Sequence, residues 1–396
     1  MGSGVLARGR TITVCAAAAL VGCLSGCTQA SNSTITVSGR TLSIYASEPP
    51  GGAGGQQARD AIAAEQLALQ QAGGQAGKFR INFVKLAGKE PSANARSAIE
   101  DPSTIAYLGE LVPGTSWISI QITNEQGVLE VSPLDTAAYL TQPSSVVPGA
   151  PGRYYPSSKT YGDTFARVVP TTAQEARADV AELPALGVRK LYVASDGQPY
   201  GSALADAVAR DAAATIPVAR GAADPASFKR SGANAAFFGS SSEPDSAHLF
   251  DALAAESPNA KLLAPSALYD DAFASSLAPA AQRNAYVSSP GFLSQDLPAA
   301  GVKFVADFKA AYGHDPAPSA IFGYEAMAAV LDVIREASSA ANSRAAVVRD
   351  FLEIRDRPSV LGTYSIVHGD TTLAPFVLSR IQGGRLVRYK FVAAQG

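Results

Sequence analysis

The sequence predicts an α/β fold made of two doubly wound, Rossmann-like lobes. Segments with strand-like and helix-like hydrophobic patterns alternate along the chain in two consecutive series, which is typical of parallel sheets covered by helices on both faces. The chain has 396 residues with 47% hydrophobic content, which is more than one hydrophobic core usually organises. Two such lobes usually enclose a cleft at the carboxyl ends of their strands.

The first series begins near residue 41. An Ala-rich helix is expected over 58–71, because Gly73 and Gly74 end its periodic pattern. The segment 116–126 carries β-branched residues, yet its place between two strands predicts a helix. The remaining helical pattern covers 94–101, and strand patterns cover 41–47, 79–86, 104–109 and 127–133.

A second series follows the polar, Tyr- and Pro-rich connection 141–163. Thr171 or Thr172 is a suitable cap for its first helix. Strand patterns cover 165–170, 188–196, 215–222, 235–240, 261–266 and 284–290. Helical patterns cover 171–186, 200–214, 243–256, 299–313, 318–339 and 343–354. The last three segments are spaced as antiparallel strands, at 361–369, 374–382 and 385–392.

The first 26 residues have the layout of a secretory signal peptide. Arg8 and Arg10 precede an uncharged run over 11–24, and small residues follow it. This run is too short to span a hydrocarbon core, which needs roughly 20 apolar residues. The sequence therefore predicts an exported domain that begins with a polar linker over 27–40.

All three cysteines lie near this signal, at Cys15, Cys23 and Cys27. The motif "LSGC", which ends at Cys27, resembles the lipobox of bacterial lipoproteins, in which the cysteine is lipidated and becomes the new N-terminus. We expect the lipid on Cys27, because the apolar run then stays intact. The motif "LVGC", which ends at Cys23, has a similar shape and is the alternative. With one lipidated cysteine, the exported domain can form no internal disulfide.

The charge of the chain excludes some partners. The formal net charge is −2, and loss of two arginines with the signal makes the exported domain slightly more acidic. This balance gives no electrostatic reason to expect a nucleic acid partner. No second run of about 20 apolar residues occurs, so the lipid is the expected attachment of a soluble domain to the membrane.

No motif indicates catalysis, a cofactor or a metal. The glycine-rich stretch 51–57 lacks the Lys-Ser/Thr of a phosphate-binding loop and the last glycine of a dinucleotide motif. His248, His314 and His368 lie far apart, without the spacing of a metal site. The "GTS" at 114–116 is no G-x-S-x-G nucleophile elbow. We therefore expect a protein that is not an enzyme and holds no cofactor.

Six phrases of the sequence resemble, in order, the solute-binding proteins of branched-chain amino acid ABC importers. They are "NARSAIEDPSTIAYLGE" (94–110), "NEQGVLEVSPLDT" (124–136), "TFARVVPT" (164–171), "GVRKLYVASDGQPYG" (187–201), "AAFFGSSSE" (235–243) and "AAYGHDPAPSAIFGYEAM" (310–327). That family has the type I periplasmic binding protein fold, in which the chain crosses between the lobes three times. The resemblance implies crossings near 169–170, 289–290 and 359–362. It assigns 41–168 and 291–360 to lobe 1, and 169–290 and 361–396 to lobe 2.

The resemblance also implies ligand contacts from loops that face the cleft. In the family, N–H groups of the first loop, at the start of a helix, bind a carboxylate or another acceptor. The second loop of the family contributes a hydroxyl. The corresponding residues are Gly114, Thr115, Ser116, Asp135 and Thr136 in the first lobe, and Tyr200, Ser240, Ser241 and Ser266 in the second.

Two positions depart from the amino acid binders. Pro113 stands where they have a serine, and Ser266 stands where they have a carboxylate for the ligand ammonium. Asp135 or Asp270 is an alternative source of that carboxylate. Loss of one charged and one neutral hydrogen bond weakens binding by about 100-fold or more. The sequence therefore favours a neutral or anionic polar solute over leucine, isoleucine or valine.

Together these features indicate a monomeric, lipid-anchored solute-binding protein outside the cytoplasm. It would capture a small polar molecule, an amino acid or a related metabolite, and close around it by hinge bending. The closed form would then present the ligand to the permease subunits of an ABC importer. The alternative is a sensor domain of the same fold that signals to a membrane receptor.

Overall fold

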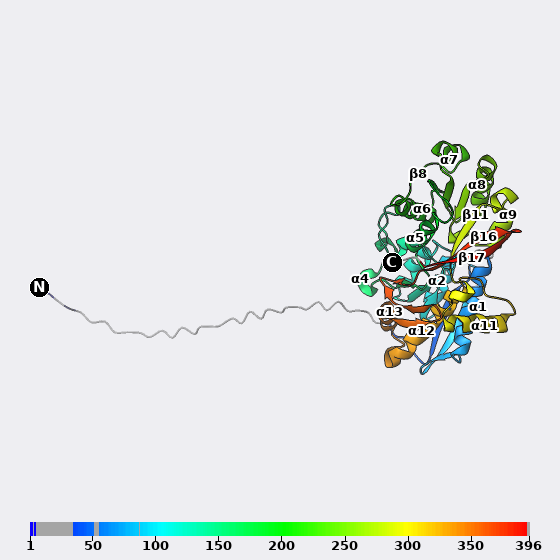
Figure 1. Cartoon of the computed structure of the whole chain (residues 1–396). Coiled ribbons are helices and arrows are strands. Elements are labelled where there is room, and N and C mark those ends of the chain that lie inside the picture. Colours follow the sequence, from blue (N-terminus) through cyan, green and yellow to red (C-terminus); the bar gives the residue numbers. More distant parts are fainter. Residues whose placement is uncertain (3, 5–34, 51–54, 87, 394–396) are drawn as a thin grey trace. The chain divides into compact units, whose positions relative to one another are not determined.

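The computed structural model describes residues 1, 2, 4, 35–50, 55–86 and 88–393. Cys27 and residues 5–26 of the expected signal peptide lie outside this part of the chain, so lipidation stays a prediction. Within the described ranges, no helix is both long and apolar enough to cross a membrane. The folded domain that follows has two lobes, the upper one mainly green and the lower one mainly blue and orange in Figure 1.

The first lobe is built on a six-stranded sheet with the order β2-β3-β1-β4-β5-β6. Its strands are β1 (Thr41–Ser47), β2 (Gln75–Ala76), β3 (Phe79–Leu86), β4 (Thr104–Leu108), β5 (Leu129–Ser132) and β6 (Phe165–Arg167). All neighbours pair in parallel except β2 and β3. The prediction of a parallel sheet in the first series is confirmed.

Helices cover both faces of this sheet. They are α1 (Gly55–Gln71), α2 (Pro91–Glu100), α3 (Ser116–Asn124), α11 (Ala299–Tyr312), α12 (Ala320–Ala337) and α13 (Arg344–Leu352). Successive side chains of a strand point to opposite faces, so Ile44 and Ala46 pack with α1 and α12, whereas Tyr45 packs with α2. Gly323 allows α12 to approach α1 closely, because a Cβ there would lie 2.3 Å from the Ala61 carbonyl oxygen.

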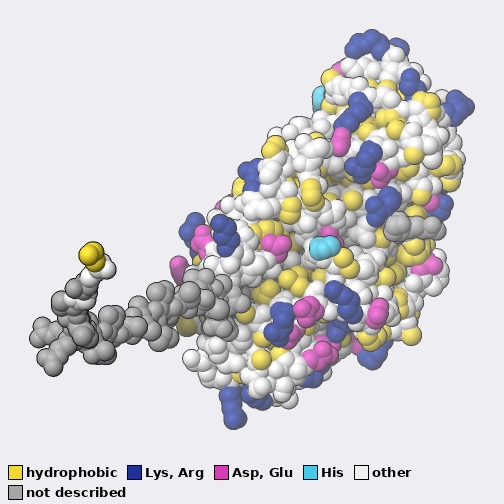
Figure 2. Space-filling model, turned by 90° about the vertical axis from the view of Figure 1, so that its left-hand side faces the viewer, with side chains coloured by type: hydrophobic (Ala, Val, Ile, Leu, Met, Phe, Trp, Pro, Cys, Tyr) yellow, Lys and Arg dark blue, Asp and Glu magenta, His cyan; other side chains and the backbone are white. Residues whose placement is uncertain are grey.

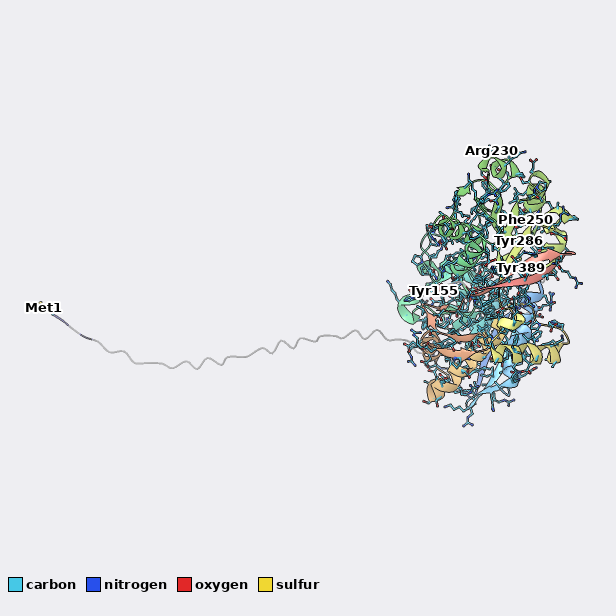
Figure 3. All side chains as sticks on the ribbon, viewed as in Figure 1. Met1, Tyr155, Arg230, Phe250, Tyr286 and Tyr389 are labelled. Atoms are coloured by element: carbon cyan, nitrogen blue, oxygen red, sulfur yellow. The ribbon has the colours of Figure 1, made fainter. Side chains whose placement is uncertain are left out.

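The second lobe has a seven-stranded sheet with the order β17-β16-β11-β10-β9-β7-β8. Its strands are β7 (Leu191–Ser195), β8 (Val218–Arg220), β9 (Ala235–Gly239), β10 (Lys261–Ala264), β11 (Ala285–Pro290), β16 (Pro375–Gln382) and β17 (Arg385–Ala393). Of the three C-terminal segments predicted as antiparallel strands, the last two form β16 and β17, whereas 361–369 lies outside this sheet. Tyr286 of β11 and Tyr389 of β17 pack edge to face at this extension, with ring centroids 6.3 Å apart (Figure 3).

The helices of the second lobe are α5 (Thr172–Glu182), α6 (Pro199–Ala212), α7 (Pro225–Ser231), α8 (Glu243–Glu256), α9 (Asp271–Ser276) and α10 (Pro279–Gln282). Of the two candidate caps of α5, Thr171 takes the role. Its Oγ1 accepts from the N–H of Gln174, and Gln174 Oε1 accepts from the N–H of Thr171. This reciprocal capping box fixes the start of the first helix after the crossing from lobe 1.

Short elements complete the two lobes. They are α4 (Ser158–Tyr161), β12 (Arg357–Ser359), β13 (Gly362–Tyr364), β14 (Ile366–Val367) and β15 (Asp370–Thr371), with 3₁₀ turns η2 (Ala138–Leu140), η3 (Gly152–Tyr154), η4 (Ser266–Leu268), η5 (Ser294–Asp296) and η6 (Ser338–Ala340). The third crossing follows β15 rather than residues 359–362. The reason is packing, because Leu361, Tyr364 and Ile366 are buried in the core of lobe 1.

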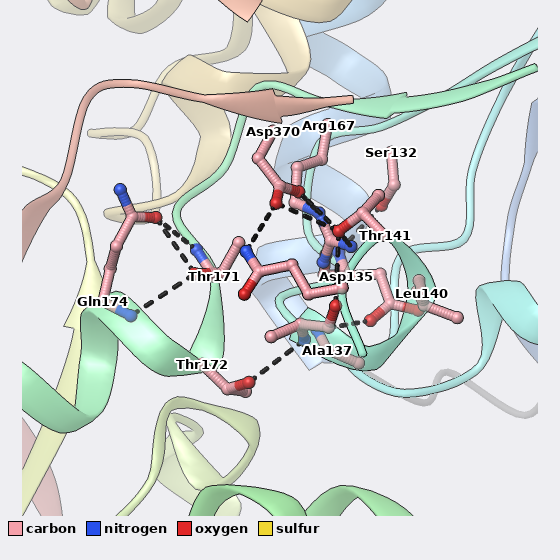
Figure 4. Close-up of polar contacts among 12 residues, drawn as sticks. Ser132, Asp135, Ala137, Leu140, Thr141, Arg167, Thr171, Thr172, Gln174 and Asp370 are labelled. Atoms are coloured by element: carbon pink, nitrogen blue, oxygen red, sulfur yellow. Dashed lines mark hydrogen bonds and ion pairs between the residues drawn. The ribbon is translucent and has the colours of Figure 1, made fainter. Parts of the chain in front are cut away.

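The buried guanidinium of Arg167, at the end of β6, ties the crossing segments together. Its Nε lies 2.9 Å from Asp370 Oδ1, and its Nη1 donates to the Asp135 carbonyl oxygen at 2.7 Å. The Asp370 carboxylate also accepts from Thr141 Oγ1 at 2.8 Å and from Gln142 Nε2 at 2.7 Å. Figure 4 shows this network, which joins the loop after β5 to the segment before β16.

Charged side chains are mixed over the surface. Figure 2 shows Lys and Arg interspersed with Asp and Glu on the face that it presents. Exposed ion pairs such as Arg220 with Asp206, at 2.8 Å, are part of this pattern. The mixture agrees with the small net charge of the sequence.

Candidate functional site

A cavity of about 330 Å³ lies between the two lobes, at the carboxyl ends of the strands of both sheets. In each sheet the first strand of the series is flanked by the next two parallel strands, β1 by β3 and β4, and β7 by β8 and β9. Doubly wound sheets bind ligands at such switch points. The lining residues are Gln57, Leu111, Val112, Pro113, Leu134, Thr136, Val169, Ser241, Ser242, Glu243, Pro244, Ser266, Ala267, Tyr269, Asp270, Ser289, Pro290 and Ser319.

The first lobe contributes the loops after β4 and β5. Leu111, Val112 and Pro113 form an apolar wall, next to Leu134 and Thr136. Thr136 is only 1% exposed, and its Oγ1 has no hydrogen-bond partner within the described chain. A buried hydroxyl without a partner costs free energy. This hydroxyl lies near that of Tyr200, and Thr136 lines the cavity, so it is a candidate contact for a ligand.

The donors of the first loop, which were expected to bind a ligand carboxylate, are already occupied. The carboxylate of the buried Asp135 accepts from the N–H of Gly114 at 2.7 Å and from that of Ser116 at 2.8 Å. It also accepts from the N–H of Ala137 at 3.0 Å. The first N–H groups of a helix need an acceptor, and here the chain supplies its own. Gly114, Ser116 and Asp135 do not line the cavity, contrary to expectation.

The second lobe contributes the loops after β9 and β10 and the end of β11. Ser241 and Ser266, two of the residues predicted to contact a ligand, line the cavity there. The N–H and the hydroxyl of Ser266 both donate to the Glu175 carboxylate, at 2.6 and 2.8 Å, and Ser288 donates to it at 2.8 Å. Burial raises the pKa of Glu175. With its proton engaged, the Ser266 oxygen can only accept a hydrogen bond from a ligand.

Three further expected contacts, Thr115, Ser240 and Tyr200, do not line the cavity. The Thr115 hydroxyl donates to a carbonyl of its own loop at 2.7 Å, and Ser240 accepts from the N–H of Ser242 at 2.9 Å. Tyr200 packs at the junction of the lobes, so close to Gly114 that a Cβ on this glycine would lie 3.0 Å from the Tyr200 Cβ. Burial raises the pKa of Tyr200 well above its ordinary value, and its hydroxyl lies near those of Ser266 and Thr136.

Sequence reasoning missed the residues that connect the lobes around the cavity. Gln57 donates from Nε2 to the Tyr269 carbonyl oxygen at 3.3 Å, and its Oε1 accepts from Ser319. Gly55 opens α1 with φ of +53°, against the side chain of Asp270. A Cβ on Gly55 would contact the Asp270 carboxylate as it lies here, and the positive φ also favours glycine at this position. Gly55, at the end of the glycine-rich stretch, was the available signal in the sequence, since it permits this close approach.

Two carboxylates line the cavity, those of Glu243 and Asp270, and the described lining residues include no Lys, Arg or His. Asp270 Oδ1 accepts from the N–H of Ala272 at 2.7 Å and so caps α9. Burial, followed by the charge of Asp270, raises the pKa of Glu243. Among the described residues, no three His, Cys, Asp or Glu side chains are grouped as a metal site. The cavity thus combines hydroxyls, carboxylates and apolar walls, which suits binding.

The sequence matches a family model described as "Periplasmic binding protein" over residues 47–374. This chain belongs to the periplasmic binding protein family. The family comprises extracytoplasmic solute-binding proteins rather than enzymes. All residues that line the interlobe cavity fall within the matched range.

Solved structures of this family share the fold. A leucine-binding protein of Thermotoga maritima is 18% identical with a TM-score of 0.73, covering 89% of this chain and 98% of its own. An ABC transporter substrate-binding protein of Desulfitobacterium hafniense, in complex with leucine, is 18% identical with a TM-score of 0.71, covering 88% and 100%. A solute-binding protein of R. palustris, in complex with benzoate, is 17% identical with a TM-score of 0.67, covering 90% and 98%. No curated protein sequence matches the chain.

Proposed function

We propose that this protein is a lipid-anchored solute-binding protein that captures a small solute between its lobes and delivers it to the permease of an ABC importer. The observation that carries the proposal is the cavity, whose walls come from both lobes. The unpartnered hydroxyl of Thr136 lines one wall, and Ser241 and Ser266 line the other. A ligand that bonds to both walls stabilises the closed arrangement over an open one.

The similar structures support a small-molecule ligand. Two of them are complexes, one with leucine and one with benzoate, of proteins with the same fold. Two of these proteins are described as parts of ABC transporters, which supports a permease as the partner. The exported protein is proposed to act as a monomer, attached to the membrane through the lipid on Cys27.

Ligand binding is expected to close the lobes. The exported chain should show a smaller radius of gyration in solution scattering when it is saturated with a hit from a thermal-shift screen of small metabolites. Trp117, the single tryptophan, is 42% exposed at the start of α3 beside the cavity loop, so its fluorescence reports the same event. Unchanged scattering at saturation would contradict capture by closure.

The variant Thr136→Val tests whether the Thr136 hydroxyl binds the ligand, because its effect on ligand binding can be measured separately from its effect on stability. The variant keeps the shape of the side chain and removes a buried hydroxyl that has no partner, so the midpoint of unfolding without ligand should stay the same or rise. The increase in midpoint caused by the ligand should shrink, because ligands stabilise through their affinity for the native state. Thr115→Val is the matched control, since that hydroxyl bonds within its own loop. Equal ligand effects in both variants would sink the proposed site.

The lipid anchor is tested at Cys27. Cys27→Ser should give a folded protein that leaves the membrane fraction, because no sulfur remains for the lipid. Cys23→Ser is the control and should stay with the membrane. The reverse outcome would place the lipid on Cys23.

A further inference from the structure

The lining of the interlobe cavity also selects for charge, an inference that rests on the proposed solute-binding function. We propose that the ligand is a small organic cation, an amine with an apolar body and without a carboxylate group. The sequence alone favoured a neutral or anionic solute. The lining residues reverse this preference, for three independent reasons.

The first reason is the balance of charge. Glu243 and Asp270 line the cavity, and none of the described lining residues is Lys, Arg or His. Asp270 has a structural role, since it caps α9 and lies against the start of α1. Glu243 has no such role, because Ser242 caps α8 and no hydrogen bond of the Glu243 carboxylate is found within the described part of the chain. A partly buried carboxylate without a partner is costly, and a ligand cation would remove that cost.

The second reason is the balance of hydrogen-bond donors and acceptors. Several donors on the cavity wall already have acceptors inside the protein. Ser266 donates to Glu175, Ser319 to Gln57, Ser289 to the carbonyl oxygen of Pro290, and Gln57 to that of Tyr269. The hydroxyls of Thr136, Ser241 and Ser242 stay available, and all three are neutral. Charged acceptors are therefore present without charged donors, which fits a ligand rich in N–H groups.

The third reason concerns the helix N-termini near the cavity. The N-cap residue of α12, Ser319, lines the cavity and makes no side-chain cap bond, but three other helices that begin there are capped by side chains of this protein. Asp135 caps α3, Ser242 caps α8 and Asp270 caps α9. A ligand carboxylate would find neither a cation nor these amides, and two carboxylates would repel it. Removing a carboxylate from water without such partners is strongly unfavourable.

The apolar walls define the rest of the ligand. Leu111, Val112 and Leu134 line the cavity from the first lobe, and Tyr269 and Pro290 line it from the second. The volume of about 330 Å³ suits a compact molecule. An aliphatic or aromatic amine matches both the apolar walls and the carboxylates.

The test uses molecules that differ by one charged group on the same skeleton. Isothermal titration of the full exported chain compares 3-methylbutylamine, leucine and 4-methylpentanoate, and a second set compares benzylamine with benzoate. The amines should bind tightest, leucine at least about tenfold more weakly, and the acids not measurably, because a charged hydrogen bond is lost and a repulsion is gained. Tighter binding of leucine or of an acid would overturn the charge preference and leave the proposed function intact.

Two variants test whether the Glu243 carboxylate pairs with the cation of the ligand. Glu243→Gln should weaken the binding of the amines by about tenfold or more, because it removes the negative charge and keeps the shape of the side chain. Asp245→Asn is the matched control, since it removes the same charge from an exposed position in the first turn of the same helix. Circular dichroism and Trp117 fluorescence confirm that both variants fold. Equal effects of the two variants, or failure of every amine while the metabolite screen yields other ligands, would contradict this inference alone. Failure of the whole screen would contradict the proposed function.

Discussion

Replacing Arg167 by methionine is expected to lower the free energy of unfolding by about 3–5 kcal/mol. The guanidinium is fully buried, with its Nε 2.9 Å from Asp370 Oδ1 and its Nη1 donating to the Asp135 carbonyl oxygen. Methionine fills much of the space but leaves the Asp370 carboxylate without its cation. A buried charge that loses its partner is the costly case, whereas removal of both partners is often close to neutral. Urea unfolding of the exported chain measures the loss.

Two further variants test this interpretation of Arg167. The double variant Arg167→Met/Asp370→Asn should recover part of the lost stability, since no unpaired charge remains. Arg349→Met is the matched control, because that arginine pairs with Asp350 on the surface and should change stability by less than about 1 kcal/mol. A similar small change for Arg167→Met would mean that the network of Figure 4 contributes little to stability.

The order of strands and helices was visible in the sequence because each element carries a local signal. Short apolar strands alternate with Ala-rich helices, and β16 and β17 have the alternating pattern of an antiparallel pair. The third crossing was placed too early because its position depends on packing across the chain. Leu361, Tyr364 and Ile366 look like strand residues in either lobe, and only the assembled core assigns them to lobe 1.

Part of the candidate site could be predicted from the sequence, because the ends of the strands carry a local signal. Spacing after the strands places Thr136, Ser241 and Ser266 near the cavity, since loops at the carboxyl ends of parallel strands meet there. The sequence does not tell in which direction a loop carboxylate points. Asp135 turns inward to the first N–H groups of α3, whereas Asp270 reaches the cavity wall.

Glu65 is an unusual carboxyl group in the core of lobe 1. It lies on α1, which packs against α12, and it is fully buried. Neither of its oxygens has a hydrogen-bond partner in the described chain. Burial therefore raises the pKa of Glu65 well above its ordinary value. The folded protein holds this group protonated at a pH at which the unfolded chain has already released the proton.

The pKa of Glu65 is higher in the folded protein than in the unfolded chain, and this difference decides whether stability rises or falls with pH. The carboxyl group of the unfolded chain titrates near about 4.3, so above that pH the unfolded state binds fewer protons than the folded state. Stability then falls as pH rises, from the unfolded pKa up to the raised folded pKa. A residue that cannot ionise at position 65 removes this slope.

Glu65→Leu is accordingly expected to raise the free energy of unfolding by about 1–3 kcal/mol at pH 7, because an unsatisfied buried polar group is replaced by an apolar side chain of similar size. The gain should shrink toward pH 4, where the wild-type carboxyl is protonated in both states. Urea unfolding at pH 4, 5.5 and 7 measures it. Glu65→Gln is the control, since it removes the titration but keeps a buried polar group, and it should flatten the pH profile with a smaller gain. A gain for leucine that is equal at pH 4 and pH 7 would show that the pKa of Glu65 is not raised in the folded state.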